Sequence, residues 1–343
     1  MNEPSRLPRS GGFARILFSL RPEEVATLVL FVPMAWALAS IAANGGGMPR
    51  TADTLNYPDA FTRLVTLAGS VALFLYVTRM RPNWTFARDV LPFLFAGNVY
   101  ANLHDMIAFF EAPDITDWLY RADVALFGVE PTLWAQRFLH PALTDFFTFS
   151  YWLFYVLPPL LGLLLYLRGK GRAFRETLVS IVFCLYVGYI GYVILPAGPP
   201  RYTIPAEAFG PPLAGLIPAL DASRGATAAV PLTAKGAFPS LHCGVMFLAM
   251  LLAWRHLRWF FPIMGFFGVG LILGTVYLRH HWVVDIFAGI ALAIVADRVT
   301  PSLERWWAAR SKEHAAASGG PFENEEGDRD DGPLRVSPRR MRG

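Results

Sequence analysis

Eight long apolar stretches divide this chain, and they constrain its fold more than any other feature of the sequence. A helix of about 20 apolar residues is long enough to cross the hydrocarbon core of a bilayer. The stretches are 24–43, 61–79, 88–110, 144–167, 175–195, 240–256, 259–278 and 282–300. Only 16% of the residues are charged, against about 25% in soluble domains. The sequence therefore predicts an all-α integral membrane protein with about eight transmembrane helices.

The placement of Lys and Arg predicts the orientation of these helices. Basic residues in short loops mark the cytoplasmic side of a membrane protein. With an even number of spans both termini lie on one side, and placing them inside puts more Lys and Arg in the inner segments than in the outer ones. The long outer segment 111–143 is rich in acidic residues instead. We therefore expect a plasma (inner) membrane protein with both termini in the cytoplasm.

The ends of the chain differ from its apolar body. Residues 1–23 are predicted as a cytoplasmic N-terminal segment. Residues 301–343 are predicted as a disordered cytoplasmic tail, because their later part is polar, rich in Gly and Ala, and contains the acidic block ENEEGDRDD. Two outer segments, 111–143 and 196–238, are longer than most connections, and long loops are often functional.

A histidine and an aspartate stand four residues apart at the start of the last apolar stretch, in RHHWVVD (279–285). In a helix, His281 and Asp285 share one face and lie about 6 Å apart along the axis. A carboxylate there can fix the tautomer of the imidazole and raise the basicity of its other nitrogen. The pair is the base-and-orienter half of a catalytic triad. The alternative is an interfacial His–Trp cluster with an Asp near a helix N-terminus.

A second polar group opens the sixth stretch, in FPSLHCG (238–244). Ser240 can cap the helix, whose free N–H groups can hold an anion. Gly244 allows a close approach of the backbone. His242 is then placed at the same depth as His281 on the outer face. The alternative is an ordinary Pro-Ser helix start with a satisfied histidine.

Three basic residues near these motifs are candidates for binding phosphate. Arg201 follows a stiff Pro-Pro pair in PAGPPRY (196–202), which suits bidentate binding of phosphate. Lys235 and Arg279 could add positive charge. In the third stretch, His104 and Asp105 are candidates for binding a head group, because ionisable residues at membrane depth tend to be functional.

A zinc site is the other way to use some of these side chains. His242, His280, His281 and Asp285 could supply ligands. The nearby arginines favour a bound anion instead, and no tight metal-binding spacing such as H-E-x-x-H occurs. We therefore expect neither a metal nor another cofactor.

Taken together, P-S-x-H-x-G and the later H-x-x-x-D resemble the second and third signatures of the phosphatidic acid phosphatase type 2 (PAP2) superfamily. DVALFGVEPTLW (123–134) and then PAGPPR are similar to the inositol phosphorylceramide synthase-like branch, whose members are inositolphosphotransferases. The resemblance covers about residues 90–300. It departs from the phosphatase pattern in two places: the first signature is missing, and Thr275 stands where an Arg is expected. These gaps weaken the case for a plain lipid phosphatase.

The resemblance implies a six-helix catalytic core at 88–300, preceded by two additional transmembrane helices at 24–87. It also implies that His281 attacks phosphorus and becomes a phospho-histidine, which Asp285 orients and stabilises. His242 then protonates the leaving oxygen and later serves as the base for an incoming hydroxyl. Arg201, Ser240 and the N-terminus of the helix that Ser240 begins hold the phosphoryl oxygens. The active site is expected on the outer, periplasmic face.

Three functions compete at this point. The first is a phosphotransferase that moves a phospho-head group, such as phosphoinositol, from one membrane lipid to the hydroxyl of another. The second is a lipid phosphate phosphatase with water as the final acceptor. The third is a lipid carrier or transporter that uses the polar cleft only for binding. The expected partners are membrane lipids as substrates, and we predict neither nucleic-acid binding nor an obligate protein partner.

Overall fold

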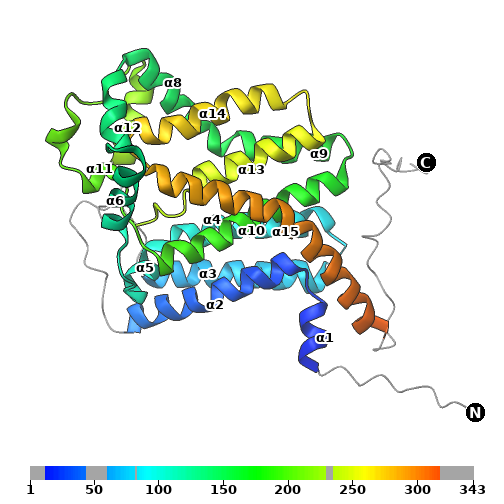
Figure 1. Cartoon of the computed structure of the whole chain (residues 1–343). Coiled ribbons are helices and arrows are strands. Elements are labelled where there is room, and N and C mark those ends of the chain that lie inside the picture. Colours follow the sequence, from blue (N-terminus) through cyan, green and yellow to red (C-terminus); the bar gives the residue numbers. More distant parts are fainter. Residues whose placement is uncertain (1–11, 44–59, 82, 229–234, 317–343) are drawn as a thin grey trace, which may run out of the picture.

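The computed structural model describes residues 12–43, 60–81, 83–228 and 235–316, and these residues form helices and connecting turns without a β-strand (Figure 1). The α-helices are α1 (Gly12–Phe18), α2 (Pro22–Ala43), α3 (Ala60–Leu75), α4 (Thr85–Ala101), α5 (Leu103–Phe110), α6 (Thr116–Phe127), α7 (Pro131–Ala135), α8 (Pro141–Trp152), α9 (Leu157–Leu167), α10 (Gly171–Ile194), α11 (Pro200–Thr203), α12 (Pro218–Ala228), α13 (Leu241–His256), α14 (Phe261–Tyr277) and α15 (Val283–Ala316). A π-helical turn (Tyr76–Met80) continues α3. Short 3-10 turns cover Gln136–Phe138, Leu153–Tyr155 and Ala206–Phe209. The predicted all-α class is confirmed.

Each of the eight predicted apolar stretches is mainly helical, but two of them are broken. Stretch 88–110 is interrupted at Asn102, between α4 and α5, and stretch 144–167 bends by 46° between Pro141–Tyr155 and α9. By length and composition, three helical spans in the described part of the chain could cross a membrane, namely Pro22–Ser40, Thr62–Met80 and Gly171–Ile194. The bent pair makes a fourth, and α13 and α14 are shorter apolar helices. A count of eight spans stays a prediction.

Helix α13 lies at the centre of the bundle and packs against α10, α14 and α15. Its side chains Met246, Leu248 and Leu252 are completely buried. At the contact with α15, a Cβ atom on Gly244 would lie 2.6 Å from the carbonyl oxygen of Gly289, so only glycine fits there. Small residues at such contacts let membrane helices approach closely. The close approach fixes the N-terminal ends of α13 and α15 side by side.

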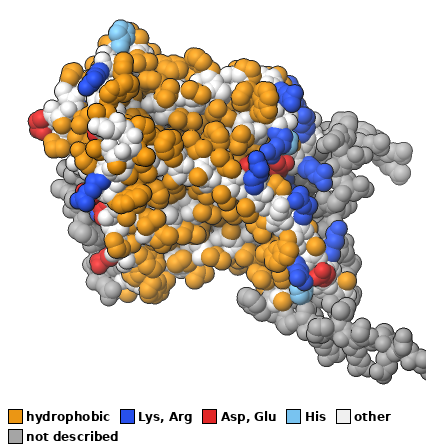
Figure 2. All heavy atoms as spheres, viewed as in Figure 1, with side chains coloured by type: hydrophobic (Ala, Val, Ile, Leu, Met, Phe, Trp, Pro, Cys, Tyr) orange, Lys and Arg blue, Asp and Glu red, His pale blue; other side chains and the backbone are white. Residues whose placement is uncertain are grey.

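The two ends of the bundle differ in character. Helices α6, α11 and α12, from the two long predicted outer segments, gather at one end, on the left in Figure 1. Lys and Arg side chains gather at the opposite end, while hydrophobic side chains cover most of the face between the two ends (Figure 2). An apolar belt between two polar ends is the surface expected of a membrane protein.

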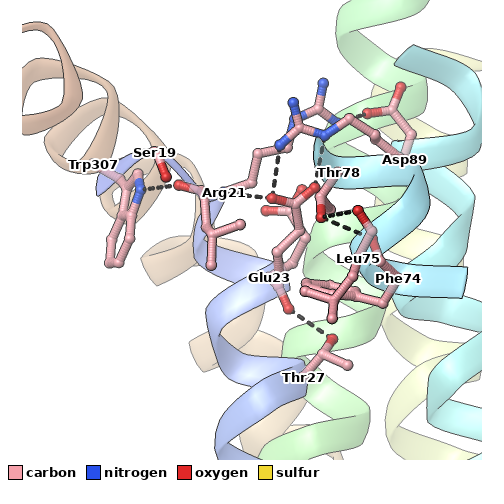
Figure 3. Close-up of polar contacts among 12 residues, drawn as sticks. Ser19, Arg21, Glu23, Thr27, Phe74, Leu75, Thr78, Asp89 and Trp307 are labelled. Carbon is pink, nitrogen blue, oxygen red and sulfur yellow. Dashed lines mark hydrogen bonds and ion pairs between the residues drawn. The ribbon is translucent and has the colours of Figure 1, made fainter. Parts of the chain in front are cut away.

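An ion-pair network ties the N-terminal helices to the rest of the bundle at this basic end (Figure 3). The carboxylate of Asp89 in α4 lies 2.5 Å from Arg21 and 3.2 Å from Arg175 of α10. Further pairs join Arg88 to Glu24 at 2.7 Å, Arg175 to Glu23 at 2.9 Å and Arg175 to Glu304 of α15 at 3.0 Å. The network therefore connects α2, α4, α10 and α15.

Residues 301–316, at the start of the predicted tail, are helical. These residues were expected to be disordered but continue α15. They hold contacts there: the Trp307 indole N–H donates to the carbonyl of Leu20 at 2.9 Å, and the ring of Phe18 stacks on that of His314. The prediction of a disordered tail was therefore wrong for these residues. The rest of the predicted tail, 317–343, lies outside the described residues.

Candidate active site

Backbone hydrogen bonds bring together the segments that carry the predicted motifs. The stretch after α10 and the stretch before α13 form a parallel bridge between Ala197 and Gly236. The N–H of Ser240 donates to the carbonyl of Asp285 at 3.0 Å, which joins the starts of α13 and α15. Segments far apart in sequence therefore meet near the end of the bundle that holds α6, α11 and α12.

His281 and Asp285 form the predicted pair. His281 Nδ1 lies 3.1 Å from Asp285 Oδ1, and both side chains are buried. The two atoms are in ion-pair contact without the alignment of a hydrogen bond. The other carboxylate oxygen, Oδ2, accepts a hydrogen bond from the N–H of Trp282 at 2.9 Å. Asp285 is thus fixed at the start of α15 with one oxygen directed to the imidazole.

His242 faces His281 from the neighbouring helix. The centroids of the two rings are 5.8 Å apart. The two imidazoles are therefore close enough to contact one bound phosphate group together.

Arg201 places a guanidinium beside the histidines. Its backbone N–H donates to the carbonyl of Arg279 at 3.1 Å, and its Nη1 lies 2.5 Å from Nδ1 of His280. Its Nε is buried and has no hydrogen-bond partner. A buried donor without a partner is costly, and an anion oxygen would satisfy it. The phosphate-binding role of Arg201 stays a prediction.

Tyr151 of α8 is part of the site, although its sequence position gave no sign of it. Its hydroxyl lies 3.1 Å from Nε2 of His242. Its ring stacks between those of His242 and His280, with both centroid distances at 4.7 Å. The stack fixes the plane of the His242 ring. In the sequence, Tyr151 is one aromatic residue in the run FFTFSYWLFY, and only the long-range contact distinguishes it.

Asp123 anchors the start of α15. In the sequence it was only the first residue of DVALFGVEPTLW (123–134), and no role was predicted for it. Its carboxylate accepts hydrogen bonds from the N–H groups of Val283 and Val284, at 2.8 and 2.9 Å. Burial raises the pKa of this carboxyl group, and the two backbone hydrogen bonds oppose the rise. Asp123 fits the role of an N-terminal anion for α15, which fixes the turn that carries His281.

Ser240 caps α13 as predicted, with its hydroxyl accepting from the N–H of Cys243 at 3.4 Å. Gly244 was predicted to bring the backbone close to phosphate. The close approach that the structure shows is instead to Gly289 of α15, so we assign Gly244 to helix packing.

Lys235 and Arg279 contact side chains other than the two histidines. Lys235 Nζ lies 2.7 Å from the carboxylate of Asp114. Burial raises the pKa of Asp114, but hydrogen bonds from Lys235 and Thr116 outweigh it, so the pKa lies below its ordinary value and the ion pair persists at neutral pH. The guanidinium of Arg279 donates to Oε1 of Gln136 at 2.6 and 3.0 Å. These contacts do not direct either side chain to the two histidines, and their phosphate-binding role stays a prediction.

The head-group role of His104 and Asp105 stays a prediction. His104 lies in α5, and its Nδ1 is buried without a hydrogen-bond partner. The side chain of Asp105 lies outside the described part of the chain. Within the described residues, no group of three His, Cys, Asp or Glu side chains has the arrangement of a metal site.

Comparison with known proteins agrees with the motifs. A family model described as PAP2 superfamily matches residues 117–298, more than half of the chain. The chain is also 29% identical, over 239 residues, to a protein named phosphoinositol dihydroceramide synthase from Bacteroides thetaiotaomicron; the match covers 62% of this chain and 76% of that relative. No solved structure matches the chain. On this evidence the chain belongs to the PAP2 superfamily, and it is a membrane enzyme that acts on lipid phosphate esters.

Proposed function

We propose that this protein is a phosphotransferase that moves a phospho-head group, phosphoinositol, from one membrane lipid to the hydroxyl of a second lipid. The observation that carries the proposal is the pair of imidazoles, His242 and His281, with ring centroids 5.8 Å apart, one of which contacts Asp285. The similarity to a phosphoinositol dihydroceramide synthase supports the choice of head group and suggests a dihydroceramide as acceptor.

The chemistry has two halves. In the first, His281 Nε2 attacks phosphorus, the bond from phosphorus to the lipid oxygen breaks, and His242 gives that oxygen a proton. In the second, His242 takes a proton from the hydroxyl of the acceptor, whose oxygen attacks phosphorus and releases His281. Asp285 stabilises the positive charge on the histidine that carries the head group.

Two further groups stabilise the charge that develops on the phosphoryl oxygens. Arg201 supplies a half-buried guanidinium whose buried Nε has no hydrogen-bond partner. The N-terminus of α13, capped by Ser240, supplies backbone N–H groups and the positive end of a helix dipole. Preorganised donors of this kind contribute without reorganising at the moment of reaction.

The placement of the site in the membrane is part of the proposal. The chain crosses the membrane eight times, with residues 88–300 as the catalytic core and 24–87 as two additional helices. Both termini are cytoplasmic, and the histidines face the outer, periplasmic side of the inner membrane. The gathering of Lys and Arg at the opposite end of the bundle supports this orientation (Figure 2).

Purified protein incubated with phosphatidylinositol and dihydroceramide tests the function. We expect an inositol-containing sphingolipid and diacylglycerol as products, and a His281→Ala variant should make neither. Release of inositol phosphate, with no transfer to dihydroceramide, would show that water is the acceptor and that the enzyme is a hydrolase.

A further inference from the structure

An apolar cavity of about 240 Å³ begins at His242 and extends into the bundle, away from the end that holds α6, α11 and α12. Four helices line it: α4, α9, α10 and α13. Its lining on α10 runs from Tyr192 to Ile181, which is about 16 Å along the helix axis at about 1.5 Å per residue. The cavity is therefore long and narrow, and it follows the direction in which lipid chains lie.

The cavity opens to the outside of the bundle between α4 and the turn before α9. Tyr100 and Tyr155, on its two sides, are 49% and 53% exposed. Gly97, also in its wall, is exposed, and a Cβ atom built there meets no atom within 4 Å. In a membrane protein an apolar opening at this position faces hydrocarbon, so a lipid chain can enter sideways without crossing water.

The geometry of phosphoryl transfer indicates which part of the lipid occupies this cavity. In an in-line displacement the attacking and leaving atoms lie on opposite sides of phosphorus. If His281 attacks from one side, the leaving oxygen departs on the side of His242. The cavity begins at His242, whereas His281 and Asp285 do not line it. The hydrocarbon chain attached to the leaving oxygen is therefore the group that the cavity can hold.

We propose that this cavity binds the hydrocarbon chain of the lipid alcohol in both halves of the reaction. The inference rests on the proposed function. When the bond from phosphorus to the lipid oxygen breaks and His242 supplies the proton, the departing diacylglycerol keeps a chain in the cavity. The acceptor alcohol must present its hydroxyl to the same His242 from the same side, so its chain enters the same cavity. The first lipid must leave before the second one binds.

A shared cavity has a kinetic consequence in the wild-type enzyme. Diacylglycerol and dihydroceramide compete for the form of the enzyme that carries the head group on His281. With phosphatidylinositol as donor, added diacylglycerol should inhibit competitively against dihydroceramide. Non-competitive inhibition would mean that the two alcohols occupy separate sites, and it would overturn the shared cavity.

Filling the cavity tests the binding of the chain. Gly97→Phe places a ring in the open wall, and Gly69→Phe on α3 is the matched control, because a Cβ atom at Gly69 also meets nothing within 4 Å and Gly69 does not line the cavity. We expect Gly97→Phe to lower kcat/KM for long-chain phosphatidylinositol and for long-chain dihydroceramide by about ten- to hundredfold. The loss should be smaller with dihexanoyl phosphatidylinositol as donor, because its short chains need less of the cavity.

The outcomes separate the two proposals. If Gly97→Phe handles long-chain lipids like the wild type, or loses activity on the dihexanoyl donor equally, the cavity does not hold the chain. If the wild type transfers nothing to any lipid alcohol, the proposed function itself fails. Should Gly97→Phe not purify as a folded protein, the inhibition pattern of the wild type still decides the question.

Discussion

Tyr151 shows how a single side chain can complete this site from outside the recognised motifs. Its hydroxyl contacts Nε2 of His242, and its ring separates His242 from His280. His280 in turn contacts Arg201. The stack therefore couples the orientation of the proposed acid–base residue to that of the proposed phosphate ligand, and we regard Tyr151 as a positioning residue.

Removal of the Tyr151 hydroxyl should affect turnover more than it affects substrate binding. Tyr151→Phe keeps the stacked ring and loses only the hydrogen bond to His242, so we expect kcat to fall about tenfold with KM unchanged. Tyr166→Phe, near the end of α9, is the control and should leave both constants unchanged. Steady-state kinetics with phosphatidylinositol and dihydroceramide measure the effect. An unchanged kcat in Tyr151→Phe would show that the ring alone positions His242.

At the scale of the helices, the close contact between α13 and α15 holds the two histidines in register. The starts of these helices are joined by the hydrogen bond from Ser240 to the Asp285 carbonyl and by the contact of Gly244 with Gly289. Asp123 of α6 fixes the start of α15 from the other side. The distance between His242 and His281 is therefore set by backbone contacts rather than by the histidines themselves.

A methyl group at this contact should separate the helices. We expect Gly244→Ala to destabilise the protein by about 1–3 kcal/mol, because the new Cβ atom meets backbone that cannot rotate away. Gly162→Ala on α9 is the matched control, since its Cβ atom would meet side chains only at 3.8 Å or more. Thermal unfolding in detergent compares the two. Equal melting temperatures would mean that α13 and α15 can move apart freely.

The sequence predicted the parts of the fold and site that depend on local patterns. The four-residue spacing predicted that His281 contacts Asp285, although His281 precedes α15 instead of lying within it, and the apolar stretches predicted the helices. It could not predict which charged groups pair with each other, since Lys235 and Arg279 were assigned to phosphate but contact Asp114 and Gln136. Long-range partners such as Tyr151 depend on how the helices pack, and one sequence does not record that packing.

At the scale of the whole molecule, the ion-pair network at the basic end separates stability from catalysis. Asp89 contacts both Arg21 and Arg175, and it joins α2 to helices of the proposed core (Figure 3). Buried charges of this kind are costly when one partner is removed. The network lies at the end of the bundle opposite α6, α11 and α12, so its disruption should leave the chemistry intact.

Asp89→Ala should therefore lower the melting temperature while the surviving folded protein keeps its kcat. We expect the free energy of unfolding to fall by about 3–5 kcal/mol, because two guanidinium groups lose a carboxylate partner. Asp221→Ala serves as the comparison. It removes a half-exposed carboxylate of α12, so we expect a smaller loss of stability. A fall in kcat of Asp89→Ala without a change in melting temperature would connect the network to the active site.

If His281 carries the head group between two lipids, a covalent adduct on this histidine can be trapped. Wild-type enzyme is mixed with phosphatidylinositol labelled in the inositol ring, without an acceptor, and is quenched under alkaline conditions that preserve phospho-histidine bonds. We predict that peptide mass spectrometry finds the label on His281, that dihydroceramide removes it, and that His281→Ala never acquires it. Label on another residue, or full transfer activity in the His281→Ala variant, would contradict the account.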